Sequence, residues 1–458
     1  MMWLKKLGIV GFGASAIGFI HGLIESGKIS NYRITILERG KDYAHNTISG
    51  VRMDGKIFIS YGMGGEIYIP LEIQAKTVEF YLKFSGYKPA ADRREGLINY
   101  LRSFERDGKK IEFGESFSNE RVYKLFYHHG FEPVKSYFFH LGTDILKETN
   151  ENIYRHFSSF ENIEFLFGVT AEDVDFGPPH RVHTEKGDFE FDELVIAVGR
   201  SGHRLMERLK EKYPQLVKPN QFVDIGIRYE LPNHVMDPFS DMYEVKIRYR
   251  TKTGYICRIF CQNPAEGDPG KVRGLHHGER ILGQSSKDRE HELCHPGHHA
   301  FYRAFKDPTG YGVNLAKLAN ILAGDREKVI LQTYGDFKEF RRTKRLGRVH
   351  PTLDPESYIL GDANLVFPSK IRESLVDFVE NLDRVIPGAA YFDNLLYAVE
   401  VKFYTNKFLN DVVEDLHVIG DCSGWTRSVQ YATSMGYMRA MGMKIQPCER
   451  ESQRIPTL

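Results

Sequence analysis

The chain has 458 residues, of which 27% are charged, and its 62 basic and 61 acidic side chains give a net charge of +1. This length allows two or three domains with substantial cores, and the balanced charge provides no overall attraction to nucleic acid or to a membrane surface. No apolar stretch reaches the roughly 20 residues that a membrane span needs, and five cysteines without regular spacing do not form a typical disulfide framework. The composition therefore favours a cytoplasmic globular protein.

The N-terminal segment predicts a nucleotide-binding βαβ unit. An apolar strand at residues 7–10 leads into a glycine turn and then into a helix. In the pattern G-x-G-x-x-G/A, Gly11 would make the tight turn, Gly13 would let the backbone approach a pyrophosphate, and Ala16 would allow close packing of helix and strand. A second strand ends in Glu38, near the spacing of about 20 residues at which an acidic side chain meets ribose hydroxyls. The alternative is a plain buried strand and helix whose glycines serve only the turn.

The next elements along the chain have mixed character. A glycine loop at residues 62–65 lies between short strands, and such a loop can approach a ligand closely. A helical excursion at about 71–140 follows, and its charged part predicts a solvated surface. Paired strands are predicted between 162 and 191, and a buried strand that starts at 192 ends in glycine.

The later half of the chain contains a change of pattern. From about residue 219 to 350, alternating strands are joined by loops rich in Gly, His and Pro, as expected of an inserted domain. A buried strand then ends in Gly420-Asp421, and a helix is predicted from Thr426 to Gly442. The nucleotide-binding pattern thus resumes near the C-terminus.

Several motifs occur in one order along nearly the whole chain. They are Gly11-Phe-Gly-Ala-Ser-Ala16, Leu37-Glu-Arg-Gly40, His140-Leu-Gly-Thr-Asp144, Ala197-Val-Gly-Arg-Ser-Gly202, Val223–Arg228, Gly347–Leu353, Val385–Gly388, Ala398–Tyr404 and Gly420-Asp-Cys-Ser-Gly424. In this order the chain resembles an uncharacterised family of bacterial and archaeal FAD-dependent dehydrogenases, which are glutathione-reductase-like flavoproteins.

The resemblance implies an α/β fold with a Rossmann-like FAD-binding domain, a parallel sheet with helices on both faces, interrupted by a mixed α+β substrate domain. The FAD-binding domain would comprise residues 1–218 and 351–458, and the substrate domain residues 219–350. Asp421 would contact the ribityl or pyrophosphate part of FAD, and N–H groups from Gly424 onward would point at the flavin N1/O2 edge. The residues that would bind FAD are Gly11, Gly13, Ala14, Ser15, Ala16, Glu38, Arg39, Gly64, Gly65, Ala197, Gly199, Gly420, Asp421 and Gly424.

We therefore expect an FAD-dependent oxidoreductase of the dehydrogenase or oxidase type. It would transfer a hydride between flavin N5 and a substrate carbon in a C–N, C–C or C–O bond. Electrons could pass to oxygen, to NAD(P) or to a carrier, and the oligomeric state is left open. The candidate catalytic residues are Glu400 and Lys402, which alternate on a strand and would share one face, and Arg427 beside the predicted flavin loop. For Glu400 and Lys402 the alternative is a structural ion pair.

Two other functions stay open at this stage. Arg341–Arg348 contains five basic residues in eight, enough to contact phosphates, so the substrate could be a nucleic-acid base or a modified nucleotide instead of another small molecule. A solvated segment is the alternative for this run. A non-catalytic FAD or nucleotide binder is the second alternative. Cysteines and histidines also crowd between 257 and 299, as in a zinc site, but without regular spacing they favour an exposed loop, and we predict no metal.

Overall fold

The computed structural model describes the backbone of residues 4–43, 56–59, 65–90, 97–110, 113–115, 117–134, 137–140, 143–220, 222–236, 246–259, 262–263, 273–277, 280–284, 292–300, 307–324, 328–351, 353, 355–403 and 405–447. The chain divides into two compact units. The first unit comprises residues 1–113, 137–220 and 405–458, and the second comprises residues 114–136 and 221–404.

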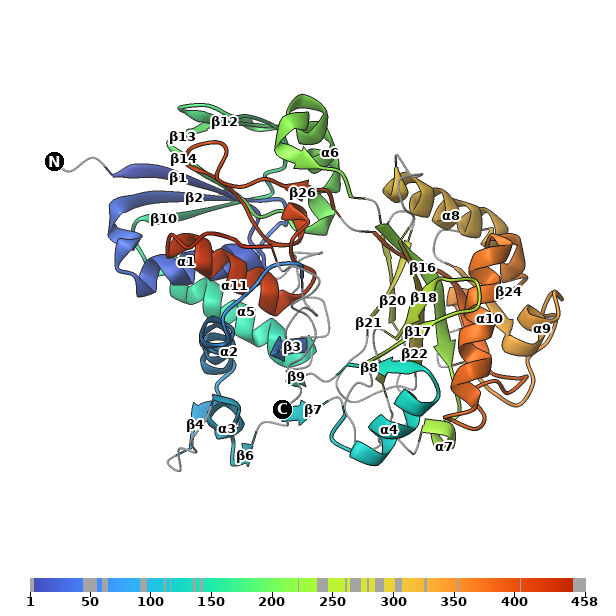
Figure 1. Ribbon diagram of the computed structural model, residues 1–458. Helices are drawn as coiled ribbons and strands as arrows, with labels where there is room; N and C mark the ends of the chain where they lie inside the picture. The colour runs from blue at the N-terminus through green and yellow to red at the C-terminus, as the bar shows by residue number, and fades with distance from the viewer. Residues whose placement is uncertain are drawn as a thin grey trace. The chain divides into compact units, whose positions relative to one another are not determined.

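The first unit is built on a five-stranded parallel sheet with the strand order β10-β2-β1-β14-β27 (Figure 1). The strands are β1 (Lys5–Val10), β2 (Tyr32–Glu38), β10 (Ile163–Phe167), β14 (Glu193–Ile196) and β27 (Leu416–Val418). Strand β1 lies at the centre, with β2 on one side and β14 on the other. The direction of the chain across the sheet therefore reverses at β1. In open α/β sheets this is the point where ligands bind, outside the carboxyl ends of the strands.

Different layers cover the two faces of this sheet. Alternate residues of β1 point to opposite faces, so their neighbours show which layer covers each face. Leu7 and Ile9 pack against helices α1 (Ala14–Glu25), α2 (Leu71–Phe84), α5 (Thr143–Ser158) and α11 (Val429–Ala440). Val10 packs on the other side, with α6 (His203–Lys212) and with a three-stranded antiparallel sheet. Its strands are β11 (Ala171–Asp175), β12 (His180–Thr184) and β13 (Gly187–Phe191). The second face thus carries a strand layer beside its helix, whereas the sequence predicted helices on both faces.

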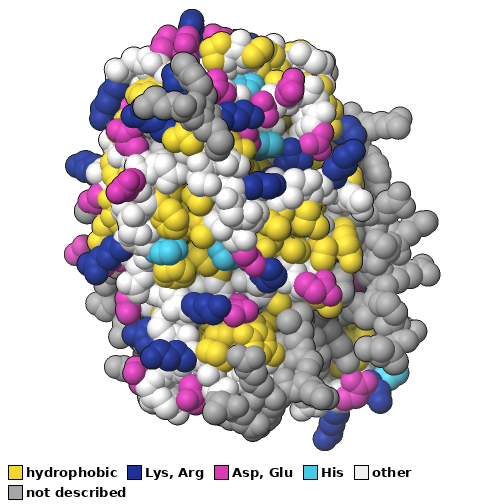
Figure 2. Space-filling model, turned by 90° about the vertical axis from the view of Figure 1, so that its left-hand side faces the viewer, with side chains coloured by type: hydrophobic (Ala, Val, Ile, Leu, Met, Phe, Trp, Pro, Cys, Tyr) yellow, Lys and Arg dark blue, Asp and Glu magenta, His cyan; other side chains and the backbone are white. Residues whose placement is uncertain are grey.

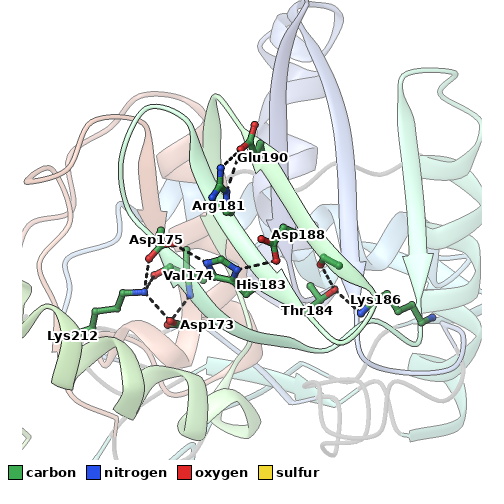
Figure 3. A network of polar contacts seen from close by, with 11 residues as sticks. Asp173, Val174, Asp175, Arg181, His183, Thr184, Lys186, Asp188, Glu190 and Lys212 are labelled. Carbon is green, nitrogen blue, oxygen red and sulfur yellow. Dashed lines mark hydrogen bonds and ion pairs between the residues drawn. The ribbon is translucent and has the colours of Figure 1, made fainter.

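A polar network joins α6 to the antiparallel sheet (Figure 3). The Lys212 ammonium lies 2.7 Å from a carboxylate oxygen of Asp173 and 2.5 Å from one of Asp175. His183 lies between two carboxylates, with Nε2 2.8 Å from Asp175 and Nδ1 2.9 Å from Asp188. Hydrogen bonds to these two carboxylates raise the pKa of His183. The network therefore links two β11 residues to a helix that is distant in sequence.

Glycines let α1 and α11 cross at very short range. A Cβ added at Gly18 would lie 1.9 Å from the carbonyl oxygen of Thr433, and one at Gly436 would lie 2.0 Å from that of Ser15. Gly18 therefore serves helix packing. Helix α11 begins at Val429, after the predicted start at Thr426, because the Ser428 side chain caps it by accepting a hydrogen bond from the Tyr431 N–H at 3.2 Å.

The second unit is built on a nine-stranded sheet with the order β24-β23-β25-β16-β22-β18-β17-β8, in which β19 also pairs with β22. Its strands are β8 (Phe131–Pro133), β16 (Phe222–Glu230), β17 (Ile247–Arg250), β18 (Ile256–Arg258), β19 (Gln262–Asn263), β22 (Glu292–Ala300), β23 (Val329–Thr333), β24 (Tyr358–Leu360) and β25 (Leu395–Phe403). Helices α8 (Pro308–Ala323) and α10 (Ser369–Asp383) share one core cluster with Val223, Ile225 and Ile227 of β16.

The second unit extends beyond the predicted substrate domain at residues 219–350. Strand β25 lies between β23 and β16 near the middle of the large sheet, so residues 351–404 belong to this unit. Residues 114–136 also join it, because β8 pairs with β17, although the sequence placed them in an excursion of the FAD-binding domain. Long-range strand pairing leaves no local mark in the sequence, and both differences follow from it.

The remaining elements are short. In the first unit they are β3 (Lys56–Ile59), which pairs with β9 (Tyr137–His140), then β4 (Lys88–Pro89), α3 (Leu97–Arg102), β5 (Phe104–Arg106), β6 (Lys109–Lys110), β15 (Val217–Lys218) and β26 (Lys407–Phe408). In the second unit they are α4 (Glu120–His128), α7 (Asn233–Met236), β20 (Arg273–His277), β21 (Arg280–Gln284) and α9 (Tyr334–Lys338). Strand β7 (Phe113–Glu115) contains the boundary along the chain between the first unit and the second, which falls after Phe113. Among the helices described, none is long and apolar enough to cross a membrane. Figure 2 shows acidic and basic side chains intermingled over one face.

Candidate nucleotide-binding site

Three glycine loops meet at the carboxyl edge of the parallel sheet. They follow β1, β14 and β27, and Gly11, Gly199 and Gly420 in these loops have φ angles of 93°, 59° and 74°. A Cβ added at Gly11 would lie 2.8 Å from the Ala197 carbonyl oxygen, and one at Gly420 would lie 2.4 Å from Ser15 Oγ. The loops therefore approach one another closely, and side chains at Gly11 or Gly420 would push them apart.

Glu38 is held in place at the end of β2. Its side chain is buried, and its two carboxylate oxygens accept hydrogen bonds from the backbone N–H groups of Phe12 and Gly40, each at 2.7 Å. An ionised carboxylate offers about four acceptor positions, so these bonds are compatible with further bonds from a ribose diol. Because Phe12 lies inside the first glycine loop, Glu38 also fixes that loop. The predicted βαβ unit with a terminal acid is confirmed.

The start of α1 provides donors for an anion. Gly13 is the N-cap, with an extended backbone and no side-chain cap, and Ala14 and Ser15 begin the first turn. The first N–H groups of a helix have no acceptor within the helix, and together with the helix dipole they favour negative charge nearby. Ala16 is fully buried and packs in the core beneath α1. Arg39, which was predicted to bind FAD, is exposed at the edge of the same site.

Asp421 lies in the loop after β27, where Arg200 and Thr426 contact its carboxylate. Its Oδ2 is 3.1 Å from Nε of Arg200, and its Oδ1 accepts a hydrogen bond from Thr426 Oγ1 at 2.9 Å. Thr405 donates a further hydrogen bond to the Asp421 carbonyl oxygen. The neighbouring Gly424 has a φ of 75°. These contacts give the Asp421 carboxylate one defined orientation beside Gly420.

An ionic cluster surrounds the predicted catalytic residue Arg427. Glu66 forms ion pairs with both Arg427 and Lys407, and the Lys407 ammonium lies 5.0 Å from the centre of the Trp425 ring. The Glu66 N–H donates to the Trp425 carbonyl oxygen at 2.8 Å. A Cβ added at the predicted ligand residue Gly65 would lie 2.5 Å from that same oxygen. The other glycine predicted from this loop, Gly64, lies outside the described residues.

The other two predicted catalytic residues belong to the second unit. On β25, Glu400 is opposite Gly226 of β16, and Lys402 is opposite Asp224. Glu400 is half-buried, whereas the side chain of Lys402 lies outside the described residues. Asp224 is fully buried and forms an ion pair with Arg258 at 2.6 Å. Both predicted residues thus lie on a strand, as expected, and their catalytic role stays a prediction.

Three residues of these clusters escaped the sequence analysis. Arg200 stands inside the quoted motif Ala197–Gly202, directly after the glycine that ends a buried strand, and this position was the available signal. Glu66 follows the glycine loop at residues 62–65, which was a similar signal. Asp224 also lies inside a motif named above, Val223–Arg228, but its ion pair had no local signal because its partner Arg258 comes from another strand.

The two cysteines that the structure describes are free and buried. Cys257 and Cys422 are buried, and burial raises the pKa of the Cys422 thiol to about 12, which keeps it protonated. Among the described residues there is no group of His, Cys, Asp and Glu that could hold a metal ion. The side chains of residues 261–300 lie outside the described part.

In the basic run, Arg341 is paired with Asp336 at 3.3 Å and with Glu339 at 2.7 Å.

A scan against protein-family models and a search of curated proteins found no match. Solved structures do match, at low similarity. The enzyme 2,6-dihydroxypyridine-3-hydroxylase from Arthrobacter nicotinovorans is 10% identical, with a TM-score of 0.37 over 96% of this chain and 82% of that chain. Glycine oxidase from Geobacillus kaustophilus is 10% identical, with a TM-score of 0.37 and 96% of both chains covered. CtdE in complex with FAD and a substrate is 11% identical, with a TM-score of 0.37 over 95% of this chain and 79% of that chain. These values leave the family open.

Proposed function

We propose that this chain is an FAD-dependent oxidoreductase and that the carboxyl edge of its parallel sheet is the cofactor site. The observation that carries the proposal is Glu38, a buried acid fixed by two N–H groups at the end of β2, beside the glycine loop of β1. Adenosine ribose would be bound by Glu38, and the pyrophosphate by Gly11, Gly13 and the start of α1. Asp421 would contact the second half of the dinucleotide. The tight contacts at Gly11 and Gly420 hold the loops after β1 and β27 close to their neighbours at this edge.

The residues near Gly424 would act on the electronic state of the flavin. When bound, FAD would supply two-electron chemistry through hydride transfer at N5. Backbone N–H groups around Gly424 and the half-buried cation Arg427 would place positive charge at the N1/O2 edge, where negative charge develops on reduction. Glu66 holds Arg427 in position, so this charge is fixed before reduction takes place.

The second unit would bind the substrate. We propose a small molecule that loses or gains a hydride at carbon, oriented in part by Glu400 and Lys402. Glu400, a half-buried carboxylate on β25, would exchange the proton that accompanies hydride transfer. The electron acceptor would be oxygen, NAD(P) or a carrier.

The first test is the absorbance spectrum of the purified protein, together with a mass measurement of any cofactor that heat releases. We expect FAD, either bound on purification or taken up by the apoprotein. Glu38→Gln should weaken FAD binding, whereas Glu164→Gln, at an exposed position on β10, should leave it unchanged. A colourless protein that takes up no FAD would contradict the proposal and favour the non-catalytic nucleotide binder.

A nucleic-acid substrate is a second candidate function with one supporting observation. Arg342, Lys344, Arg345 and Arg348 of the basic run are exposed. Carboxylates at Asp336 and Glu339 lower the positive potential beside Arg341. Retention of the protein on tRNA that falls steeply with added salt would support this function. No retention at low salt would exclude it.

A further inference from the structure

The ion pair between Arg200 and Asp421 lies where the proposed cofactor would bring its phosphates. Arg200 directly follows Gly199 in the loop after β14, and Asp421 directly follows Gly420 in the loop after β27. These two strands are adjacent and parallel, so both loops leave the sheet at the same edge as the loop of Gly11. The ion pair is thus part of the carboxyl edge.

An acid at this edge creates an electrostatic problem for a dinucleotide. The Asp421 carboxylate and a pyrophosphate are both negative, and like charges at short range repel strongly where water is partly excluded. Asp421 has only 15% of its side-chain surface exposed and Arg200 has 21%, so solvent screens neither charge fully. A cation in contact with Asp421 would therefore offset the repulsion between this carboxylate and the pyrophosphate.

The geometry assigns that task to Arg200. Its Nε contacts Oδ2 of Asp421 at 3.1 Å, while Thr426 holds Oδ1 at 2.9 Å from the other side. Thr426 is neutral and can orient the carboxylate, but it cannot cancel its charge. The guanidinium stays charged at any physiological pH.

We propose that Arg200 is a positioning residue of the dinucleotide site, which acts by neutralising Asp421 so that a pyrophosphate can bind beside it. This inference rests on the proposed function and deepens it, because it names a residue through which the site accepts a doubly charged ligand. In this role Arg200 acts through Asp421 rather than through the phosphates. The distinction makes the proposal testable by a double-mutant cycle.

The experiment measures the dissociation constant of FAD for the apoprotein, by flavin fluorescence, in the wild type, Arg200→Gln, Asp421→Asn and the double variant. We expect Arg200→Gln to weaken FAD binding by roughly 10-fold to 100-fold, the range of a strong pairwise coupling. In the Asp421→Asn background the same change should cost less than about 3-fold, because no carboxylate is left to neutralise. Arg200→Lys should retain most of the affinity. Arg204→Gln, at an exposed position on α6, is the matched control and should bind FAD as the wild type does.

Ionic strength provides a readout that a purely structural role would not change. Between about 0.05 M and about 0.5 M salt, the Debye length falls roughly threefold and the partly exposed charges are screened more, so the loss caused by Arg200→Gln should shrink. An equal loss in both backgrounds would overturn the proposal, since Arg200 would then contact the phosphates itself or serve only folding. Normal FAD binding by Arg200→Gln would also overturn it. If the wild type binds no FAD, the proposed function fails, and this inference fails with it.

Discussion

The crossing of α1 and α11 makes a strong prediction about Gly18. A Cβ added there would lie 1.9, 2.7 and 2.9 Å from the O, C and Cα atoms of Thr433, all of which are backbone atoms. No side-chain rotation can relieve these contacts, so α11 would have to shift. Overpacking of a tight core costs about 1–3 kcal/mol, and a backbone clash belongs at the upper end. Alanine regains about 1 kcal/mol of helix propensity. We therefore expect Gly18→Ala to lower the free energy of unfolding by about 2 kcal/mol.

The assay is urea denaturation followed by circular dichroism, with Gly177→Ala as the matched control. Gly177 has no atom within 4 Å of an added Cβ and no positive φ. Alanine there should leave stability unchanged or raise it by about 0.4–1 kcal/mol, because it restricts the unfolded chain. A Gly18→Ala protein as stable as the wild type, with an unchanged m-value, would refute the close approach of the two helices.

Three further predictions concern side chains of the first unit. Burial opposes ionisation of Glu193, but hydrogen bonds from His417 and Lys5 lower its pKa from 4.5 to about 2. The stabilisation of the fold by ionised Glu193 is therefore complete above pH 4.5 and is lost as the pH falls towards 2. Glu193→Gln should remove this part of the acid sensitivity seen in pH-dependent unfolding. Cys422 should react with a thiol reagent, mapped by mass spectrometry, only after unfolding; labelling of the native protein would contradict its burial. Glu66→Gln removes a negative charge beside Arg427 and Lys407, so the reduction potential of bound flavin should rise, whereas an unchanged potential would place the cluster away from the flavin.

The βαβ segment at the N-terminus could be predicted because its signals are local. Strand β1, the glycine turn, helix α1 and strand β2 follow one another, and the spacing from Gly11 to Glu38 is a property of one contiguous segment. The hydrogen bond from Phe12 to Glu38 is the tertiary consequence of that spacing. Local sequence signals therefore sufficed for the β1-α1-β2 unit and for the position of Glu38 at its end.

The domain limits and the ion pairs could not be predicted in the same way. Strand β25 has an apolar pattern that fits either unit, and only its pairing with β16 and β23 assigns it to the second. The antiparallel layer on the second face of the first sheet is held partly by side chains such as Lys212, which contacts Asp173 although the two residues are far apart in the sequence. Each of these contacts depends on chain segments that meet only after folding, and no window of sequence contains both partners.

Each acid of the proposed site is held by donors or cations of the protein, and this affects how tightly the site could bind a charged cofactor. Glu38 is held by two N–H groups, Asp421 by Arg200 and Thr426, and Glu66 by Arg427 and Lys407. Each carboxylate is therefore oriented and solvated by protein groups before any ligand arrives. The cost of ordering these side chains then belongs to folding rather than to binding, and preorganised dipoles and charges stabilise a ligand without further reorganisation. A variant that loosens one partner should thus weaken cofactor binding more than it weakens the fold.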